Sequence, residues 1–193
     1  MSILLSSNGS KIDDMLPEIS LCPCALDIET TGFSKYFDRI CVLSVATEHK
    51  YWIVQYPDRS LLESVLKCAN CIVGHNLSFD IPFIQEKIGK KILPKRIFDT
   101  MAAAQILENR KRGEKGTFTL KGVAKRYLGI DVDKGEQRSD WSGNLTESQI
   151  KYCVRDVMIP LELYKTMWHK IANSWHRVRL EAEMNRILAK WNK

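Results

Sequence analysis

Four acidic residues and one tyrosine stand at spacings that could bring their side chains together around metal ions. Asp27 and Glu29 occupy alternate positions of an apolar segment, so a strand there would present both carboxylates on one face. Asp80 follows a second apolar segment, and Tyr152 and Asp156 are spaced to share one face of a helix. Carboxylate oxygens are the ligands of hard divalent cations, and two such ions can stabilise both the attacking and the leaving oxygen of a phosphodiester. The pattern therefore predicts a metal-dependent nuclease site.

The segments that must position these residues show two kinds of pattern. Three strand-like runs with short connections, at 24–29, 39–47 and 50–56, predict an antiparallel meander. Further along the chain, helical patterns alternate with short strands. The expected helices are 60–70, with a capping box formed by Ser60 and Glu63, then 78–89, the alanine-rich part of 96–112, and 119–129; short strands are expected at 71–76 and at the start of 96–112.

The last long helix carries the tyrosine and the fourth carboxylate. It begins with Thr146 and Gln149, which match a capping box, and it contains Pro160, where we expect a bend. An apolar stripe occupies one face, and Tyr152 and Asp156 lie on the other face together with further apolar residues. A helix that is apolar on both faces should be buried on both, so Asp156 is predicted to face a pocket. A metal ion there would offset the unfavourable burial of an unpaired carboxylate.

The composition predicts a single soluble domain. The 193 residues, 45% of them hydrophobic, suffice for one domain with its own core. The net charge of +6 fits a polyanionic partner, although solvated lysines explain the charge equally well. No stretch approaches the ~20 apolar residues of a membrane span, and the first residues lack the pattern of a signal peptide. We therefore expect a soluble intracellular protein, cytoplasmic and without membrane contact, whose six cysteines are thiols.

Three short motifs carry a resemblance to a known family. DIETTG at 27–32, NLSFD at 76–80 and YCVRD at 152–156 resemble, in this order, the motifs of the DEDD family of 3′–5′ exonucleases in its tyrosine-bearing branch. Each motif alone is a weak signal, but all three in the expected strand or helix context are specific. The resemblance covers about residues 22–170 and implies an α/β RNase H-like fold, with a mixed central sheet flanked by helices.

The resemblance also implies roles for the five residues. Asp27, Glu29 and Asp156 would be direct ligands of two divalent metal ions, Mg²⁺ or Mn²⁺, and Asp80 would hold the second ion partly through water. Tyr152 would orient the attacking water. Simpler explanations exist for several of them. Asp27 and Glu29 could be a pair of acids at a strand end that form salt bridges with cationic side chains. Asp80 could cap a helix, and Tyr152 could be an ordinary packed side chain.

Other residues are expected to contact the substrate. Phe33 matches an apolar wedge against the terminal base, although it could also anchor its own loop, and Asn76 matches a residue beside the substrate strand. The loop that contains Arg112 and Lys115 could contact phosphates or be a solvated basic loop. For His75, satisfying backbone groups at the strand end is the simpler role. The full set of expected substrate-binding residues is Thr30, Phe33, His75, Asn76, Phe79, Arg112 and Lys115.

The resemblance divides between two subfamilies. DTMAAAQIL and TLKGVAKRYLG look like the proofreading domain of family A DNA polymerases, whereas KGEQRSDW resembles RNase D and the Werner-type exonucleases. The first likeness implies hydrolysis of single-stranded or frayed DNA from its 3′ end to nucleoside monophosphates. The second implies trimming of RNA. A non-catalytic nucleic-acid-binding module is a third hypothesis, disfavoured because all four carboxylates and the tyrosine are present.

The chain is expected to contain three segments. They are a loose N-terminal leader at 1–20, the exonuclease domain at 21–173, and an amphipathic C-terminal helix at 174–193. This helix carries an apolar stripe that could pack back on the domain, mediate self-association, or bind a partner such as a DNA polymerase. The stripe consists of Leu180, Met184, Ile187, Leu188 and Trp191.

Overall fold

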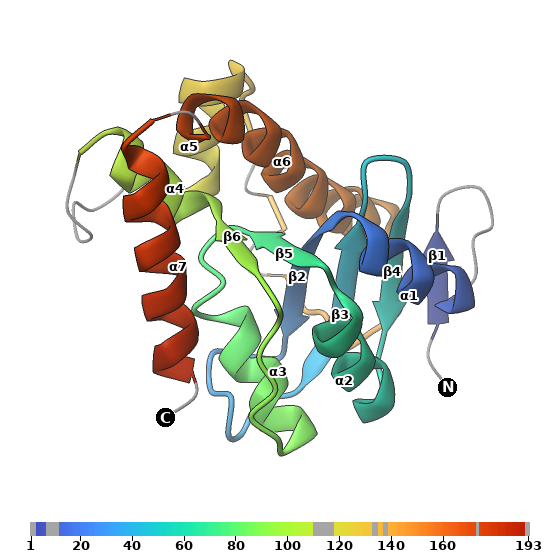
Figure 1. Ribbon diagram of the computed structural model, residues 1–193. Coiled ribbons are helices and arrows are strands. Elements are labelled where there is room, and N and C mark those ends of the chain that lie inside the picture. Colours follow the sequence, from blue (N-terminus) through green and yellow to red (C-terminus); the bar gives the residue numbers. More distant parts are fainter. Residues whose placement is uncertain are drawn as a thin grey trace.

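The computed structural model describes residues 3–6, 12–109, 118–132, 135–136, 139–172 and 174–191. Within them, the strands form one mixed six-stranded sheet in the order β1-β4-β3-β2-β5-β6 (Figure 1). Strands β2, β3 and β4 are neighbours and antiparallel, which confirms the predicted meander, whereas β5 and β6 continue the sheet in parallel. The strands are β1 Ile3–Ser6, β2 Pro23–Thr30, β3 Ile40–Ala46, β4 Tyr51–Gln55, β5 Cys71–Gly74 and β6 Ile97–Asp99.

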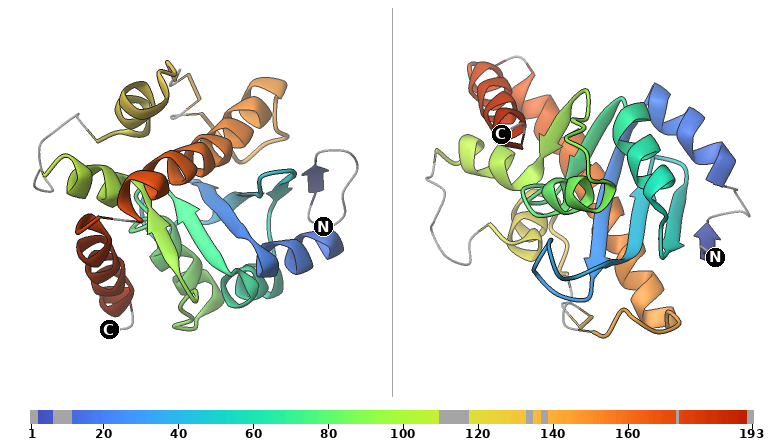
Figure 2. Two further views of the ribbon diagram at one scale, coloured as in Figure 1. Left: turned by 45° about the horizontal axis from the view of Figure 1, so that its top comes forward. Right: turned by 90° about the horizontal axis from the view of Figure 1, so that it is seen from below.

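Helices cover both faces of the sheet. One long helix, α6, crosses one face and packs on β2, β3, β4 and β5, while α1, α2 and α3 lie on the opposite face (Figure 2). Every residue of β3 is therefore buried, as expected for a strand covered on two sides. This architecture confirms the predicted RNase H-like fold. The helices are α1 Ile12–Leu21, α2 Arg59–Cys68, α3 Asp80–Ile88, α4 Thr100–Leu107, α5 Leu120–Leu128, α6 Glu147–Ile171 and α7 His176–Trp191.

The expectation of a loose leader at 1–20 was wrong for the residues that the structure describes. Residues 3–6 form β1, which pairs with β4 at the edge of the sheet, and 12–21 form helix α1. Met15 and Ile19, one helical turn apart, are fully buried, and the Ile19 carbonyl accepts a hydrogen bond from the Asn70 backbone at 2.8 Å. The apolar face of α1 is short and its residues are separated by polar ones, so the sequence pattern suggested a leader instead of a helix.

Local signals at the helix ends were confirmed in one case and wrong in another. At the start of α6, Thr146 and Gln149 form the predicted capping box. Helix α2 instead begins after Asp58, whose side chain accepts a hydrogen bond from the Leu61 backbone at 2.8 Å. Glu63, expected in a capping box, forms ion pairs with lysines. Asp58 forms the N-cap because its carboxylate lies directly before the first helical turn, where it can accept from a free backbone N–H.

Helix α7 packs back on the domain. It contacts α4 and β6, and its apolar stripe is buried apart from the partly buried Leu188. The backbone N–H of Asp99 donates to the Met184 sulfur at 3.4 Å, so the helix is attached to the edge strand. Of the three alternatives for this stripe, packing back on the domain is therefore the one that the structure shows, while a polymerase partner or self-association through 174–193 stays a prediction.

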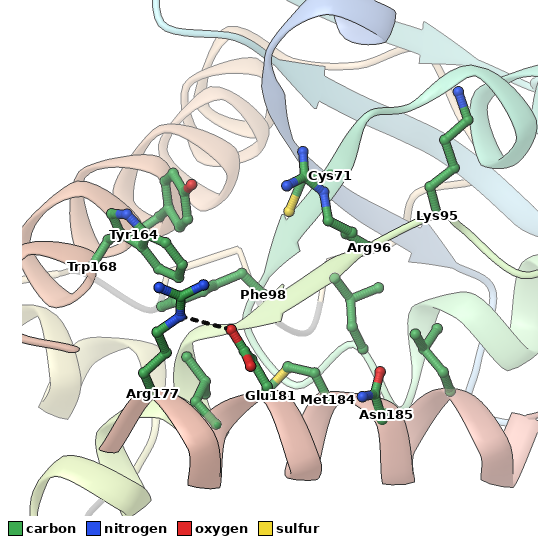
Figure 3. A pocket seen from close by; sticks show the side chains of 13 residues that line it. Cys71, Lys95, Arg96, Phe98, Tyr164, Trp168, Arg177, Glu181, Met184 and Asn185 are labelled. Atoms are coloured by element: carbon green, nitrogen blue, oxygen red, sulfur yellow. Dashed lines mark hydrogen bonds and ion pairs between the residues drawn. The ribbon is translucent and has the colours of Figure 1, made fainter. Parts of the chain in front are cut away.

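A pocket of about 370 Å³ remains between α6, β6 and α7 (Figure 3). Phe98, Tyr164 and Trp168 form its aromatic side, and Arg177 pairs with Glu181 at its rim. The pocket contains none of the residues expected in the active site. All six cysteines are free thiols, as expected, and no helix among the described residues is long and apolar enough to cross a bilayer.

Candidate active site

Strand β2 carries the first two carboxylates in the middle of the sheet, between β3 and β5. Asp27 and Glu29 alternate with the buried residues Leu26 and Ile28. Both carboxylates interact electrostatically with Asp156 of α6, so both project toward this helix. Among the described residues, neither forms an ion pair with a cationic side chain, which argues against a structural salt bridge.

Helix α6 supplies the tyrosine and the fourth carboxylate from one face. Tyr152 and Asp156 are one turn apart, and the Asp156 carboxylate lies close enough to the phenol to raise the pKa of Tyr152. The Tyr152 ring packs against Trp141, with ring centroids 5.8 Å apart. These contacts hold the phenol beside the carboxylates, as the four-residue spacing predicted.

Asp80 reaches the same place from the other side of the sheet. It is the first residue of α3 and is buried, with 4% of its surface exposed. Its Oδ1 accepts a hydrogen bond from the Ile28 backbone at 3.2 Å, between the positions of Asp27 and Glu29. The residue at the N-cap of α3 is Phe79, which makes no side-chain cap. Asp80 therefore joins the carboxylate cluster rather than serving only as a helix cap.

The four carboxylates lie close together, and their environment disfavours ionisation. Burial raises the pKa of Glu29 to about 8, with Asp156 and Asp80 adding to the shift. Burial likewise raises the pKa of Asp80 to about 7 and that of Asp27 well above its usual value, with Asp80, Glu29 and Asp156 adding to the Asp27 shift. A cluster that resists ionisation in this way is stabilised by a bound cation.

The donor set fits divalent metal ions. All four side chains offer carboxylate oxygens, the ligands that hard cations such as Mg²⁺ take. The ligand cage is not preassembled, because no three acidic, histidine or cysteine side chains among the described residues are arranged to hold an ion. The hydrogen bond from the Ile28 backbone orients Asp80, and the Arg155 Nε lies 3.3 Å from the Asp156 Oδ1.

Comparison with known proteins gives the family. The model of the 3′–5′ exonuclease family matches residues 8–172 of the chain. The chain belongs to this 3′–5′ exonuclease family. DNA polymerase I of Aquifex aeolicus is 33% identical over 145 residues, which cover 74% of this chain and 23% of that protein. Ribonuclease D of Zymomonas mobilis is 27% identical over 175 residues, which cover 84% of this chain and 42% of that protein.

Solved structures support the same fold for this exonuclease. Escherichia coli RNase D matches with a TM-score of 0.77 and 22% identity, over 94% of this chain and 48% of that chain. Brucella melitensis NrnC bound to pGG matches with a TM-score of 0.75 and 21% identity, over 88% and 82%. The exonuclease chain thus spans less than half the length of these two curated relatives, the polymerase and the ribonuclease.

The expected substrate-binding residues of the exonuclease lie in different environments. Phe33 is 92% exposed and makes an edge contact with Phe79, with ring centroids 6.4 Å apart. Asn76 has a left-handed backbone (φ 67°), and its Oδ1 accepts a hydrogen bond from Ser78 at 2.6 Å. Thr30 donates its hydroxyl to the Gly32 carbonyl at 2.5 Å. Arg112 and Lys115 lie outside the described residues, so their substrate contacts stay predictions.

For His75 the structure favours the structural role. Its Nε2 lies 2.9 Å from the Phe118 carbonyl, and its Nδ1 lies 2.9 Å from the Thr100 hydroxyl. Burial lowers the pKa of His75, so the ring is neutral and donates from Nε2. Both ring nitrogens have partners within the protein, and the expected contact of His75 with substrate stays a prediction. The ring instead connects the end of β5 to the start of the segment at 118.

Asp99 supports the site, although the sequence did not single it out. It is 1% exposed and accepts hydrogen bonds from four backbone N–H groups. Oδ1 accepts from Asn76, Met101 and Ala102 at 3.1, 2.9 and 3.2 Å, and Oδ2 accepts from Leu77 at 3.0 Å. The carboxylate therefore caps α4 and also holds the turn that leads to Asp80. Its place before α4 was a local signal for the cap, but nothing local pointed to residues 76 and 77.

We expect Asp99→Ala to destabilise the fold by about 3 kcal/mol or more, because four buried donors lose their acceptor. Asp99→Asn is the matched variant: it keeps one oxygen for most of these bonds, so its loss should be smaller. Urea denaturation of both variants at one pH measures the difference. Equal stability of wild type and Asp99→Ala would contradict the role.

Arg155 is a second residue that the motif did not identify. Its Nε lies 3.3 Å from Asp156 Oδ1, and its guanidinium carbon lies 4.7 Å from the centroid of the Tyr152 ring. The guanidinium lowers the pKa of Asp156, opposing the larger effect of burial, which raises it. Arg155 thus helps to keep Asp156 ionised and the Tyr152 ring in place.

We expect Arg155→Met to move the acidic limb of the pH profile of kcat/KM to higher pH at limiting metal. Without the guanidinium, the pKa of Asp156 rises and protons compete more strongly with the cation. Arg155→Lys keeps the charge and should move the limb less. Profiles measured at one subsaturating Mn²⁺ concentration test this; an unmoved limb, or one displaced to lower pH, would rule it out.

Proposed function

We propose that this exonuclease hydrolyses single-stranded or frayed DNA from the 3′ end, releasing nucleoside monophosphates with two divalent ions, Mg²⁺ or Mn²⁺. The observation that carries the proposal is the convergence of Asp27, Glu29, Asp80 and Asp156 with Tyr152 around one buried acidic site. A module that only bound nucleic acid would gain nothing from this cluster, because carboxylates repel phosphates. A non-catalytic role is therefore disfavoured.

DNA is the favoured substrate, and RNA is the second candidate. Similarity to a DNA polymerase I at 33% identity supports DNA, whereas similarity to ribonuclease D at 27% supports RNA. Discrimination between the two requires a group that reads the 2′-hydroxyl of the sugar. The five residues of the acidic site would act on the phosphodiester, which both polymers share, so they support either substrate equally.

The residues of the chain would divide the chemistry between them. The four carboxylates would hold the cations, which supply Lewis-acid stabilisation of the phosphodiester and make water more acidic. Asp80 would keep its orientation through the hydrogen bond from the Ile28 backbone. The antiparallel register of β2 against β3, with Asp27 opposite Ser44 and Glu29 opposite Val42, would set the separation of Asp27 and Glu29. These constraints favour an ordered site over one assembled from loops.

Tyr152 would orient the attacking water without acting as its base. Burial raises the pKa of Tyr152 far above its usual value, and the charges of Asp156 and Glu29 raise it further. The phenol therefore remains protonated at neutral pH and would donate a hydrogen bond to the nearby Asp156 carboxylate. Its oxygen can then accept a hydrogen bond from water and fix the direction of attack.

The test uses matched DNA and RNA strands, labelled at either the 3′ or the 5′ end, with Mg²⁺, Mn²⁺ or EDTA. We expect the 3′ label to be released first as a mononucleotide and the 5′-labelled strand to shorten as a ladder, in either metal and not in EDTA. Faster hydrolysis of DNA supports the proposal, and faster hydrolysis of RNA would replace it by the second candidate. Binding of both strands without cleavage in either metal would favour a binding module.

A further inference from the structure

The loop between β2 and β3 exposes three aromatic side chains within five residues. Phe33 is 92% exposed, Tyr36 is 67% exposed and Phe37 is 93% exposed. Large aromatic residues are normally covered, and a concentration of them on a surface marks a site that contacts something else. Phe33 already has an expected role beside the terminal base. Tyr36 and Phe37, at the tip of the loop, have none.

The loop is held in one shape by its own hydrogen bonds. Asp38 accepts from the Thr31 hydroxyl at 3.0 Å and from the Ser34 backbone at 2.9 Å. The Thr31 backbone donates to the Arg39 carbonyl at 3.1 Å, which closes the base of the loop. A side chain at Gly32 would come within 2.6 Å of the Asp38 carboxylate, so the close approach requires glycine. The aromatic rings are therefore presented by an ordered scaffold, which lowers the entropic penalty of binding.

The loop lies next to the acidic site. It leaves β2 directly after Thr30, and it lies beside α3, whose first residue is Asp80 (Figure 1). Two contacts fix it there: the edge contact between Phe33 and Phe79, and an ion pair between Lys35 and Glu86 at 3.9 Å. From Arg39 back to Tyr36 is only three residues, so the tip lies within ~11 Å of the loop base.

Two cationic side chains, Lys35 and Arg39, lie near the aromatic residues of the loop, and Lys35 also pairs with Glu86. The Lys35 amine lies 5.0 Å from the centroid of the Tyr36 ring, and Arg39 is exposed at the base of the loop. Aromatic rings interleaved with cations form stacking surfaces for single-stranded nucleic acids, because every base offers a π-face and every linkage a phosphate. An aliphatic partner surface would not require aromatic side chains in particular.

We propose that Tyr36 and Phe37 form a stacking subsite for unpaired bases upstream of the 3′-terminal nucleotide. The inference rests on the proposed exonuclease function and specifies its substrate class: an unpaired 3′ end several nucleotides long, in DNA or RNA. Stacking uses the base and not the sugar, so the subsite selects for single strands and leaves the choice of sugar open. A base-paired end cannot place its bases on these rings.

The experiment measures binding separately from hydrolysis. Fluorescence anisotropy in EDTA gives Kd for labelled single strands of DNA and RNA, either intact or with one abasic nucleotide moved stepwise from the 3′ end. The variants are Tyr36→Ala, Phe37→Ala, Phe37→Leu and Phe37→Trp. Trp175→Ala is the matched control, because Trp175 is also exposed, at 60%, but lies before α7.

We expect Phe37→Ala to weaken binding about tenfold for DNA and RNA alike. Phe37→Trp should restore it and Phe37→Leu should not, which separates stacking from general apolar contact. An abasic nucleotide at the position that stacks on Phe37 should weaken binding to the wild type by a similar factor. It should not weaken binding to Phe37→Ala any further, because both changes remove the same interaction. In hydrolysis, KM should rise with kcat nearly unchanged.

Three results would overturn the subsite: no binding of any strand by the wild type, equal Kd for Phe37→Ala and Trp175→Ala, or abasic penalties that are the same in wild type and Phe37→Ala. Hydrolysis by wild type together with any of these would reject the subsite alone. Ring-dependent binding without hydrolysis in any metal would reject the exonuclease proposal and leave the stacking interaction standing.

Discussion

Replacement of Asp27 by asparagine is expected to lower kcat by roughly 10³-fold or more, since cation binding supplies several kcal/mol of transition-state stabilisation. Asp27 lies at the centre of the cluster, where its charge interacts with those of Asp80, Glu29 and Asp156. Asparagine has nearly the same shape but cannot provide the anionic ligand. Single-turnover hydrolysis of a 3′-labelled strand at saturating Mn²⁺ measures the loss.

The same substitution should not unfold the protein. Because the pKa of Asp27 is raised well above its usual value, burying Asp27 at neutral pH costs the wild type either a bound proton or a buried charge. Asparagine avoids that cost, so it should raise the stability of the metal-free chain. Thermal melts in EDTA separate this effect from catalysis. Asp13→Asn, at an exposed acidic residue in the first turn of α1, is the control and should change neither property much. Hydrolysis by Asp27→Asn at the wild-type rate would remove Asp27 from the proposed mechanism.

The second large effect concerns the pH dependence of stability without metal. The pKa of Glu29 is raised from 4.5 to about 8 and that of Asp80 from 3.8 to about 7. Between about pH 4 and pH 8 the native state therefore binds more protons than the unfolded state, and the free energy of unfolding falls as pH rises. Each extra bound proton contributes a slope of about 1.4 kcal/mol per pH unit.

Metal should reverse this trend, because a divalent cation binds the ionised native cluster and not the unfolded chain. We expect Mn²⁺ to raise Tm more at pH 8 than at pH 5, relative to EDTA. Glu29→Gln should flatten the EDTA profile, because it removes one of the shifted groups. Calorimetry at several pH values measures both effects. A flat EDTA profile, or a Tm that does not respond to Mn²⁺, would contradict the proposed metal site.

The parts of this protein that the sequence predicted correctly depend on local periodicity. Alternation placed Asp27 and Glu29 on one face of β2, and the four-residue spacing placed Tyr152 and Asp156 on one face of α6. The capping box at Thr146 marked the start of α6 correctly. Backbone geometry alone imposes these relations, because side chains repeat every two residues in a strand and about every 3.6 in a helix. The three motifs then indicated which of these faces meet.

Tertiary structure decided the features that depend on partners far away in the chain. Asp99 accepts hydrogen bonds from the backbone of the turn at 76–77. Arg155 contacts the Tyr152 ring and the Asp156 carboxylate, and the His75 ring contacts the Phe118 carbonyl. Helix α1 and the stripe of α7 are covered by surfaces that no local pattern encodes. Burial, which determines the pKa of every carboxylate in the site, is likewise a sum over distant atoms. Composition and spacing therefore determine which groups the chain offers, while packing determines which of them are charged, occupied or free to bind.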